Sequence, residues 1–91
     1  MTPEALKRVR VRLGLSQERM AAVLGTSFVS VNRWEGGHST PLKSVTDLYL
    51  ALEAALSRGV APEKLVRISA QERPLFLRDL FSLAYPREGG V

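Results

Sequence analysis

As far as about residue 60, the chain contains a regular series of residues typical of helix starts and helix ends. This series constrains the fold more than any other feature of the sequence. Thr2 followed by Pro3 is typical of a helix N-terminus, and Gly14 is typical of a helix end. Between them apolar side chains recur at helical spacing, which predicts a helix over 3–13. No stretch before residue 60 alternates apolar and polar residues for long enough to indicate a β-strand, so we expect an all-α fold.

Residues typical of helix starts and ends also predict two further helices. Ser16 and Gly25 bound a predicted helix over 17–24, and Ser27 begins another over 28–35. Only three residues separate these two helices. Such a short link forces them to cross at a steep angle, as in a helix-turn-helix.

The rest of the chain is expected to form a longer helix followed by shorter ones. Thr40 and Pro41 predict the start of a helix over 41–57, which carries one apolar stripe. Pro62 and Pro74 favour the starts of short helices, because proline lacks a backbone N–H and clashes inside a helix. We therefore predict a compact bundle of four to six short helices.

The distribution of charge favours an anionic partner. The chain has 13 Lys and Arg against 9 Asp and Glu, a formal net charge of +4. Residues 1–40 hold six of the basic side chains and three of the acidic ones, so most of the excess lies in the first half. A basic half beside a nearly neutral one suits a polyanion, with nucleic acid as the first candidate.

Composition argues against several other classes of function. The chain has no cysteine and a single histidine, His38, so we expect no metal site and no cofactor. Ser39 beside His38 lacks an orienting acid and an oxyanion site, and no glycine-rich phosphate loop follows a strand, so we expect no enzyme. No apolar run suits a membrane span and the first residues do not resemble a signal peptide, so a cytoplasmic, nucleoid-associated protein is expected.

The predicted helix over 28–35 has one face that suits a core and one that suits DNA. Val31 and Trp34, three residues apart, are expected to point inward. The opposite face combines apolar, amide and guanidinium groups from Phe28, Val29, Asn32 and Arg33. Arginine can bond guanine, asparagine can pair with adenine, and apolar side chains can cover a thymine methyl. Phe28 can alternatively pack back against the preceding helix.

Residues 6–56 resemble the Xre/Cro family of helix-turn-helix domains, the phage-repressor type. The resemblance is carried by Leu-Ser-Gln at 15–17, Met-Ala-Ala-Val-Leu-Gly at 20–25 and Arg-Trp-Glu-x-Gly at 33–37, together with Arg10, Ser27, Val31 and Pro41. It implies a lambda-repressor-like DNA-binding domain over 1–58, whose helix over 28–35 enters the major groove. Phe28 and Val29 depart from the family pattern, in which many relatives carry polar residues there.

The resemblance also implies roles for individual residues. Phe28, Val29 and Arg33 align with base-reading positions, and Asn32 shares their face. Arg10 and Glu35 align with a pair that forms an interior salt bridge in this family. Contacts with the DNA backbone are expected at Gln17, Ser27, Ser30, His38, Ser39 and Lys43.

Residues 59–91 lie beyond the resemblance and are expected to form a C-terminal helical extension. Apolar residues crowd into it more densely than one seam of a surface helix requires, chiefly Phe76, Leu77, Leu80 and Phe81. They complete the core, form a homodimer interface, or do both. We expect a homodimer, because a two-fold dimer places two recognition helices in successive major grooves. Residues 88–91 are expected to be a frayed end.

The sequence thus predicts a sequence-specific regulator of transcription, a repressor, that binds double-stranded DNA as a homodimer. The main alternative is an antitoxin-type protein-interaction module, whose C-terminal helices bind a toxin or another protein. A DNA-targeting accessory of a larger complex and a helical bundle that binds no nucleic acid also fit the sequence. A heterologous protein bound to the C-terminal apolar face would favour the interaction module.

Overall fold

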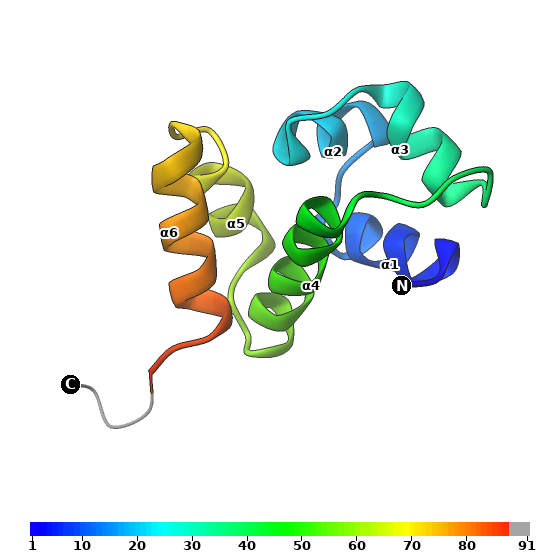
Figure 1. Ribbon diagram of the computed structural model, residues 1–91. Coiled ribbons are helices and arrows are strands. Elements are labelled where there is room, and N and C mark those ends of the chain that lie inside the picture. Colours follow the sequence, from blue (N-terminus) through cyan, green and yellow to red (C-terminus); the bar gives the residue numbers. More distant parts are fainter. Residues whose placement is uncertain (88–91) are drawn as a thin grey trace.

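The computed structural model describes residues 1–87 and is helical without strands over that part of the chain (Figure 1). The elements in chain order are α1 Pro3–Leu13, α2 Gln17–Leu24, α3 Phe28–Glu35, α4 Lys43–Ser57, α5 Pro62–Ile68 and α6 Arg73–Ala84. The predicted all-α bundle of four to six helices is therefore confirmed. The frayed end predicted for residues 88–91 lies outside the described residues.

Local signals set the bounds of the first three helices, which agree with the prediction from sequence. The hydroxyls of their N-cap residues, Thr2, Ser16 and Ser27, each accept a hydrogen bond from the backbone N–H three residues further on. Gly14 and Gly25 close α1 and α2 at φ of 74° and 72°. This left-handed conformation favours glycine, because a Cβ would be strained there.

The later helices agree less closely with the predicted starts. The predicted start of α4 at Thr40 and Pro41 is wrong by two residues, because Leu42 is still extended and acts as the N-cap. The residues before it are used to cross from the end of α3 to α4, along the long loop seen in Figure 1. α5 begins at Pro62 as predicted, and α6 begins one residue before Pro74, which lies in its first turn.

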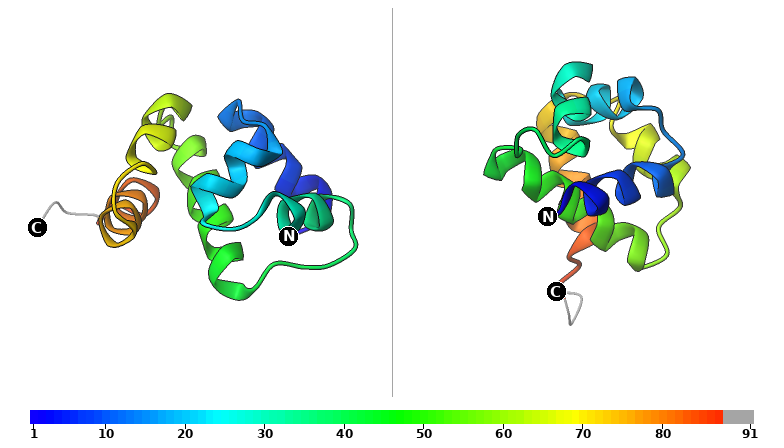
Figure 2. Two further views of the ribbon diagram at one scale, coloured as in Figure 1. Left: turned by 90° about the horizontal axis from the view of Figure 1, so that it is seen from above. Right: turned by 90° about the vertical axis from the view of Figure 1, so that its right-hand side faces the viewer.

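α4 lies in the middle of an elongated molecule of 43 × 24 × 22 Å (Figures 1 and 2). It packs against α1 on one side and against α6 on the other. α2 packs mainly against α3, which also contacts α1, and α5 contacts α1 and α6. The unit of α1, α2 and α3 thus lies on one side of α4, and the C-terminal pair α5 and α6 lies on the other.

One apolar core connects the two sides. It contains Leu6 and Val9 of α1, Tyr49 and Leu52 of α4, and Phe76 of α6 in a single cluster of buried side chains. The C-terminal extension is therefore packed into the same core as the helices before it. None of the helices described for residues 1–87 has the length and apolar character needed to cross a membrane.

Candidate nucleic-acid interface

The tight turn between α2 and α3 sets the orientation of α3. The backbone N–H of Thr26 donates to the carbonyl of Ala21 at 2.9 Å, which closes the end of α2, and Ser27 then caps α3. On the inner side of α3, Val31 and Trp34 are buried in the core. These contacts hold α2 and α3 as a helix-turn-helix, with the other face of α3 directed outward.

The outer face of α3 carries the side chains that the sequence marks as base readers. Phe28 is 45% exposed and Val29 is 61% exposed, and Asn32 and Arg33 are exposed beside them. Large apolar side chains next to an amide and a guanidinium are unusual on a face that meets only water. The same combination suits the edges of base pairs in a major groove.

Behind this face, Arg10 of α1 and Glu35 at the end of α3 form a two-pronged salt bridge. Arg10 Nε donates to Glu35 Oε2 at 2.7 Å, and Arg10 Nη2 donates to Glu35 Oε1 at 2.9 Å. The third nitrogen, Nη1, donates to the carbonyl of Leu15 at 2.9 Å. One guanidinium therefore joins α1, the end of α3 and the residue that precedes the cap of α2.

Burial and hydrogen bonding act in opposite directions on this pair. The side chain of Glu35 is only 4% exposed and that of Arg10 is 13% exposed. Burial by itself raises the pKa of the Glu35 carboxyl, but hydrogen bonds from Arg10 and Gln17 outweigh it and hold the pKa below the ordinary value of 4.5. The hydrogen bonds to Glu35 raise the pKa of the Arg10 guanidinium. Both groups are therefore charged at neutral pH.

Gln17 extends this network to the outer face of α3. Its Nε2 donates to Glu35 Oε1 at 3.1 Å, and its Oε1 accepts from Asn32 Nδ2 at 3.0 Å. The sequence predicts Gln17 as a contact to the DNA backbone and Asn32 as a base reader. The structure brings the two side chains together through this hydrogen bond.

A depression of about 240 Å³ lies over this network, between α1, α2 and the end of α3. Gln17, Asn32 and His38 line it, and so does Lys7 of α1. Sequence reasoning missed Lys7 as a candidate, although it precedes Arg10 by one helical turn and that spacing could have indicated it. The depression therefore combines a lysine with amide and imidazole groups at the edge of α3.

Other predicted backbone contacts lie outside the depression. Ser27 and Ser30 pair through their hydroxyls at 3.0 Å at the start of α3, and Ser39 lies in the loop after it. Lys43 opens α4 and is 88% exposed at its side chain, with its ammonium 2.9 Å from Asp47 one turn along. An exposed pair of this kind contributes little to stability, so Lys43 can exchange Asp47 for another anion at low cost.

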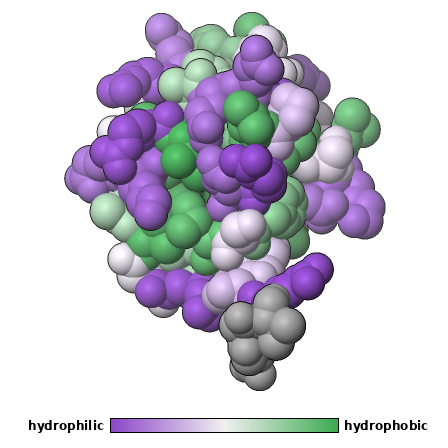
Figure 3. Space-filling model, turned by 90° about the vertical axis from the view of Figure 1, so that its left-hand side faces the viewer, coloured by the Kyte–Doolittle hydropathy of each residue, from purple (hydrophilic) through white to green (hydrophobic). Residues whose placement is uncertain are grey.

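The apolar residues predicted in the extension divide between two faces of α6. Phe76 and Leu80 are buried in the core, whereas Leu77 is half-buried and Phe81 is 37% exposed. The ring of Phe81 and the ring of Tyr85, the residue that follows α6, have centroids 6.0 Å apart. Leu77 and Phe81 border a groove of about 430 Å³ between α4 and α6. Apolar patches divided by polar groups are visible on the side of the molecule that Figure 3 shows.

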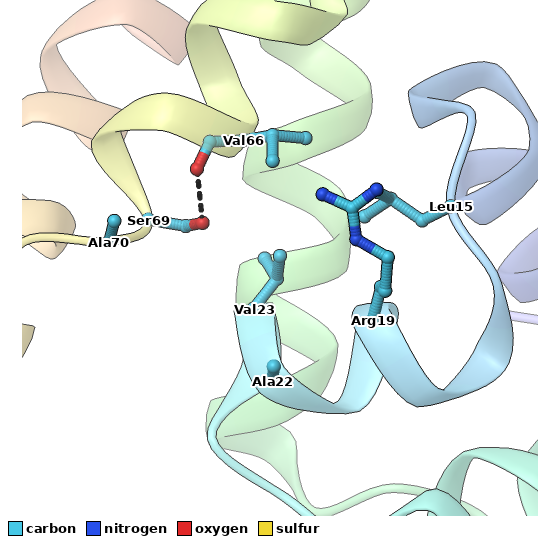
Figure 4. Close-up of a pocket in the computed structure, with 7 residues that line it drawn as sticks. All are labelled: Leu15, Arg19, Ala22, Val23, Val66, Ser69 and Ala70. Atoms are coloured by element: carbon cyan, nitrogen blue, oxygen red, sulfur yellow. Dashed lines mark hydrogen bonds between the residues drawn. The ribbon is translucent and has the colours of Figure 1, made fainter.

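A further pocket of about 390 Å³ separates α2 from α5 (Figure 4). Ala22 and Val23 of α2 face Val66 of α5 across it, and the guanidinium of Arg19 extends along its rim. The pocket shares no lining residue with the outer face of α3. Among residues 1–87, no group of three or more His, Cys, Asp or Glu side chains could hold a metal ion.

The crossed helix pair, the exposed face of α3 and the charge network behind it define a DNA-binding class of domain. Residues 6–46 match the helix-turn-helix family, of the Xre and lambda-repressor type. This segment runs from α1 through the first turn of α4, and its match agrees with the helix-turn-helix type predicted from the sequence. Domains of this family serve DNA-binding regulators. No curated protein and no solved structure matched the chain.

Proposed function

We propose that the protein is a sequence-specific transcriptional repressor that binds double-stranded DNA as a homodimer in the cytoplasm, with α3 in the major groove. The observation that carries the proposal is the exposed outer face of α3, which is the second helix of the helix-turn-helix. In this motif the second helix lies in the major groove and its first residues contact base edges.

Base readout is assigned to four side chains on that face: Phe28, Val29, Asn32 and Arg33. Arg33 can donate two parallel hydrogen bonds to guanine O6 and N7. The amide nitrogen of Asn32 carries two hydrogens, so its bond to Gln17 leaves one for a base. Phe28 and Val29 cannot form hydrogen bonds through their side chains, so they are assigned to thymine methyl groups.

Positioning on the duplex is assigned to polar groups around α3. Gln17 is the first residue of α2, where backbone N–H groups and the helix dipole favour an anion such as a phosphate. Lys7, in the same depression, adds a positive charge at that place. The other proposed backbone contacts are Ser27, Ser30, His38, Ser39 and Lys43. Contacts of this kind set the register of the protein and carry no sequence information.

The homodimer is assigned to the exposed face of α6. Leu77 and Phe81 lie four residues apart on one face of α6, and the ring of Tyr85, the residue just after the helix, lies 6.0 Å from that of Phe81, so the three side chains form one apolar stripe. The stripe borders the groove between α4 and α6, which gives a second copy both a ridge and a hollow to pack against. A two-fold pair places both recognition helices on one face of the duplex.

Enrichment of binding sites from a random pool of duplex DNA tests the proposal. We expect a palindrome with half-sites about 10 base pairs apart, selected at about 150 mM salt to suppress nonspecific phosphate binding. Arg33→Ala is the matched variant, because it removes one proposed reader and should blur one position in each half-site. Failure to enrich any motif would overturn the proposal. It would favour the antitoxin-type interaction module, and capture of a heterologous protein by α6 would then be the next test.

A further inference from the structure

We infer that Arg73, the first residue of α6, is a positioning residue for DNA recognition, because it ties the C-terminal extension to the turn of the helix-turn-helix. The inference rests on the proposed function, in that it concerns how the same DNA-binding face is held in place. Arg73 lies outside the segment that matches the family. It therefore gives the extension a role in DNA recognition besides completing the core.

The contacts of Arg73 lead from α6 directly to the end of α2. Its Nη1 donates to the carbonyl of Val23 at 2.9 Å, across 50 residues of sequence. Its guanidinium carbon lies 5.3 Å from the centre of the Phe76 ring, and Phe76 is buried in the core. A cation over an aromatic face is attracted to it. The guanidinium is thus held on α6 while it bonds the backbone of α2.

Arg73 also supplies what the end of α2 lacks. The last carbonyls of a helix have no partner within the helix, and its C-terminus carries a partial negative charge. The two backbone N–H groups that follow α2 bond the carbonyls of Ala21 and Ala22, and Arg73 bonds the next one, that of Val23. The last turn of α2 has no basic residue of its own. The cation comes from the extension instead.

Apolar packing does not close the space on either side of this contact. The pocket of about 390 Å³ separates α2 from α5 (Figure 4), and the groove of about 430 Å³ lies between the end of α2, α4 and α6. Arg73 and Leu24 both line the groove. The arginine therefore adds a polar link between the two sides at the end of α2, where Val23 and Leu24 are themselves buried in the shared core. Its loss leaves the end of α2 less constrained.

The guanidinium also lies directly against the turn at Gly25. A Cβ built on Gly25 would lie well inside van der Waals contact with Arg73 Nη2. Gly14 offers a matched comparison, because it closes α1 with nearly the same φ and a Cβ there would meet nothing within 4 Å. Alanine at Gly14 therefore adds only backbone strain. Alanine at Gly25 adds the same strain and also forces the guanidinium of Arg73 to shift.

The inference is tested by measuring the affinity of the Arg73→Ala variant for the duplex that the wild-type protein enriches. If the loosened turn leaves about a tenth of the molecules with α3 correctly placed, affinity falls about tenfold. The slope of affinity against salt should stay that of wild type, because no phosphate contact is removed. Arg78→Ala is the control, since it removes an equal charge from an exposed position on the same helix and should leave affinity unchanged.

The outcomes separate the inference from the proposed function. If wild type enriches no duplex, the proposed function has failed, and with it the premise of the inference. If wild type binds DNA and Arg73→Ala binds equally well, only the inference is overturned. A salt slope reduced by about one in Arg73→Ala would mean that Arg73 contacts a phosphate itself, which also overturns the positioning role.

Thermal unfolding of the glycine variants gives a second test that needs no DNA. In the wild-type protein, we expect Gly25→Ala to lower Tm more than Gly14→Ala does. In protein that already carries Arg73→Ala, we expect the two glycine substitutions to lower Tm by the same amount. Equal effects of Gly25→Ala in both backgrounds would overturn the contact. Should Arg73→Ala fail to fold, Gly25→Ala provides another route, because it displaces the guanidinium and should also weaken DNA binding about tenfold.

Discussion

The salt bridge between Arg10 and Glu35 lies behind the outer face of α3, on which the proposed DNA contacts lie. It joins α1 to the end of α3, and through Gln17 it reaches the amide of Asn32 on the outer face. A charge pair in this position also explains how an acidic residue can lie in a DNA-binding motif without repelling phosphate. Its negative charge is balanced by a guanidinium at hydrogen-bond distance.

Removal of Arg10 should therefore destabilise the fold strongly. Arg10→Ala leaves the nearly buried carboxylate of Glu35 without its guanidinium, and we expect a loss of about 3 kcal/mol in the free energy of unfolding, measured in urea. Arg12→Ala, an exposed arginine of the same helix, should change it by no more than about 0.5 kcal/mol. Replacement of both partners, Arg10→Met with Glu35→Leu, should cost less than Arg10→Ala alone. Equal losses for Arg10→Ala and Arg12→Ala would contradict a role for the pair in stability.

The lowered pKa of Glu35 predicts a loss of stability in acid. In the unfolded chain this carboxyl titrates near 4.5, whereas in the folded protein it binds its proton less tightly. Its stabilising contribution is therefore complete above pH 4.5 and disappears as the pH falls through the lower folded value. Between about pH 5 and pH 3, Tm of wild type should fall more steeply than Tm of Glu35→Gln. Glu63→Gln, an exposed acid on α5, should keep the wild-type slope. A Glu35→Gln curve parallel to wild type would exclude this linkage.

Replacement of Arg33 and replacement of Gln17 should affect DNA binding in different ways. Arg33→Ala removes a proposed base contact, so discrimination at one base pair should fall by about 1–3 kcal/mol. Gln17→Ala removes a proposed phosphate contact and should weaken binding to all sequences alike. Competition titrations with single-base variants of the selected site distinguish the two. A selective loss in Gln17→Ala would mean that Gln17 acts by orienting Asn32, to which it is bonded.

At the scale of the element, α6 has two apolar faces that differ in burial. One face buries Phe76 and Leu80 beneath α4, and the other exposes part of Phe81 beside the groove. The sequence shows only that α6 is too apolar for a lone surface helix. The packing of α4 against α6 decides which of its side chains are enclosed.

The two phenylalanines of α6 should therefore differ in their effect on stability. Phe76→Ala creates a cavity in the core and should cost about 3–5 kcal/mol in the free energy of unfolding. Phe81→Ala removes a side chain that is already 37% exposed and should cost about 1 kcal/mol or less in the monomer. Urea unfolding of both variants at low protein concentration makes the comparison. Equal losses would show that the two faces of α6 are not distinct.

At the scale of the whole molecule, the proposed homodimer has a direct test in hydrodynamic mass. At micromolar concentration we expect twice the chain mass of 10.0 kDa. Phe81→Ala should shift the protein to the monomer, because it removes the centre of the exposed stripe on α6. Val11→Ala is the control, as Val11 is an exposed apolar residue on α1 and lies away from that stripe. A monomer at all concentrations would exclude self-association through α6.

The sequence by itself determined the bounds of α1, α2 and α3 and the inner and outer faces of α3. These features depend on interactions within about four residues, namely cap hydroxyls, glycine at positive φ and apolar side chains at helical spacing. The local pattern was insufficient at α4, where Thr40 and Pro41 look like a helix start but Leu42 is the cap. The path of the loop from α3 decides that position, and no local signal encodes it.

Only the tertiary structure decided which distant groups meet. It placed Asn32 against Gln17, added Lys7 to the same depression, and brought Arg73 to the carbonyl of Val23. In the sequence, Gln17, Asn32, Lys7 and Arg73 do not differ from the many other polar residues. Their partners are set by the shared core, in which α4 packs against both sides of the molecule. Close packing of that core fixes the distances between groups that are far apart in the sequence.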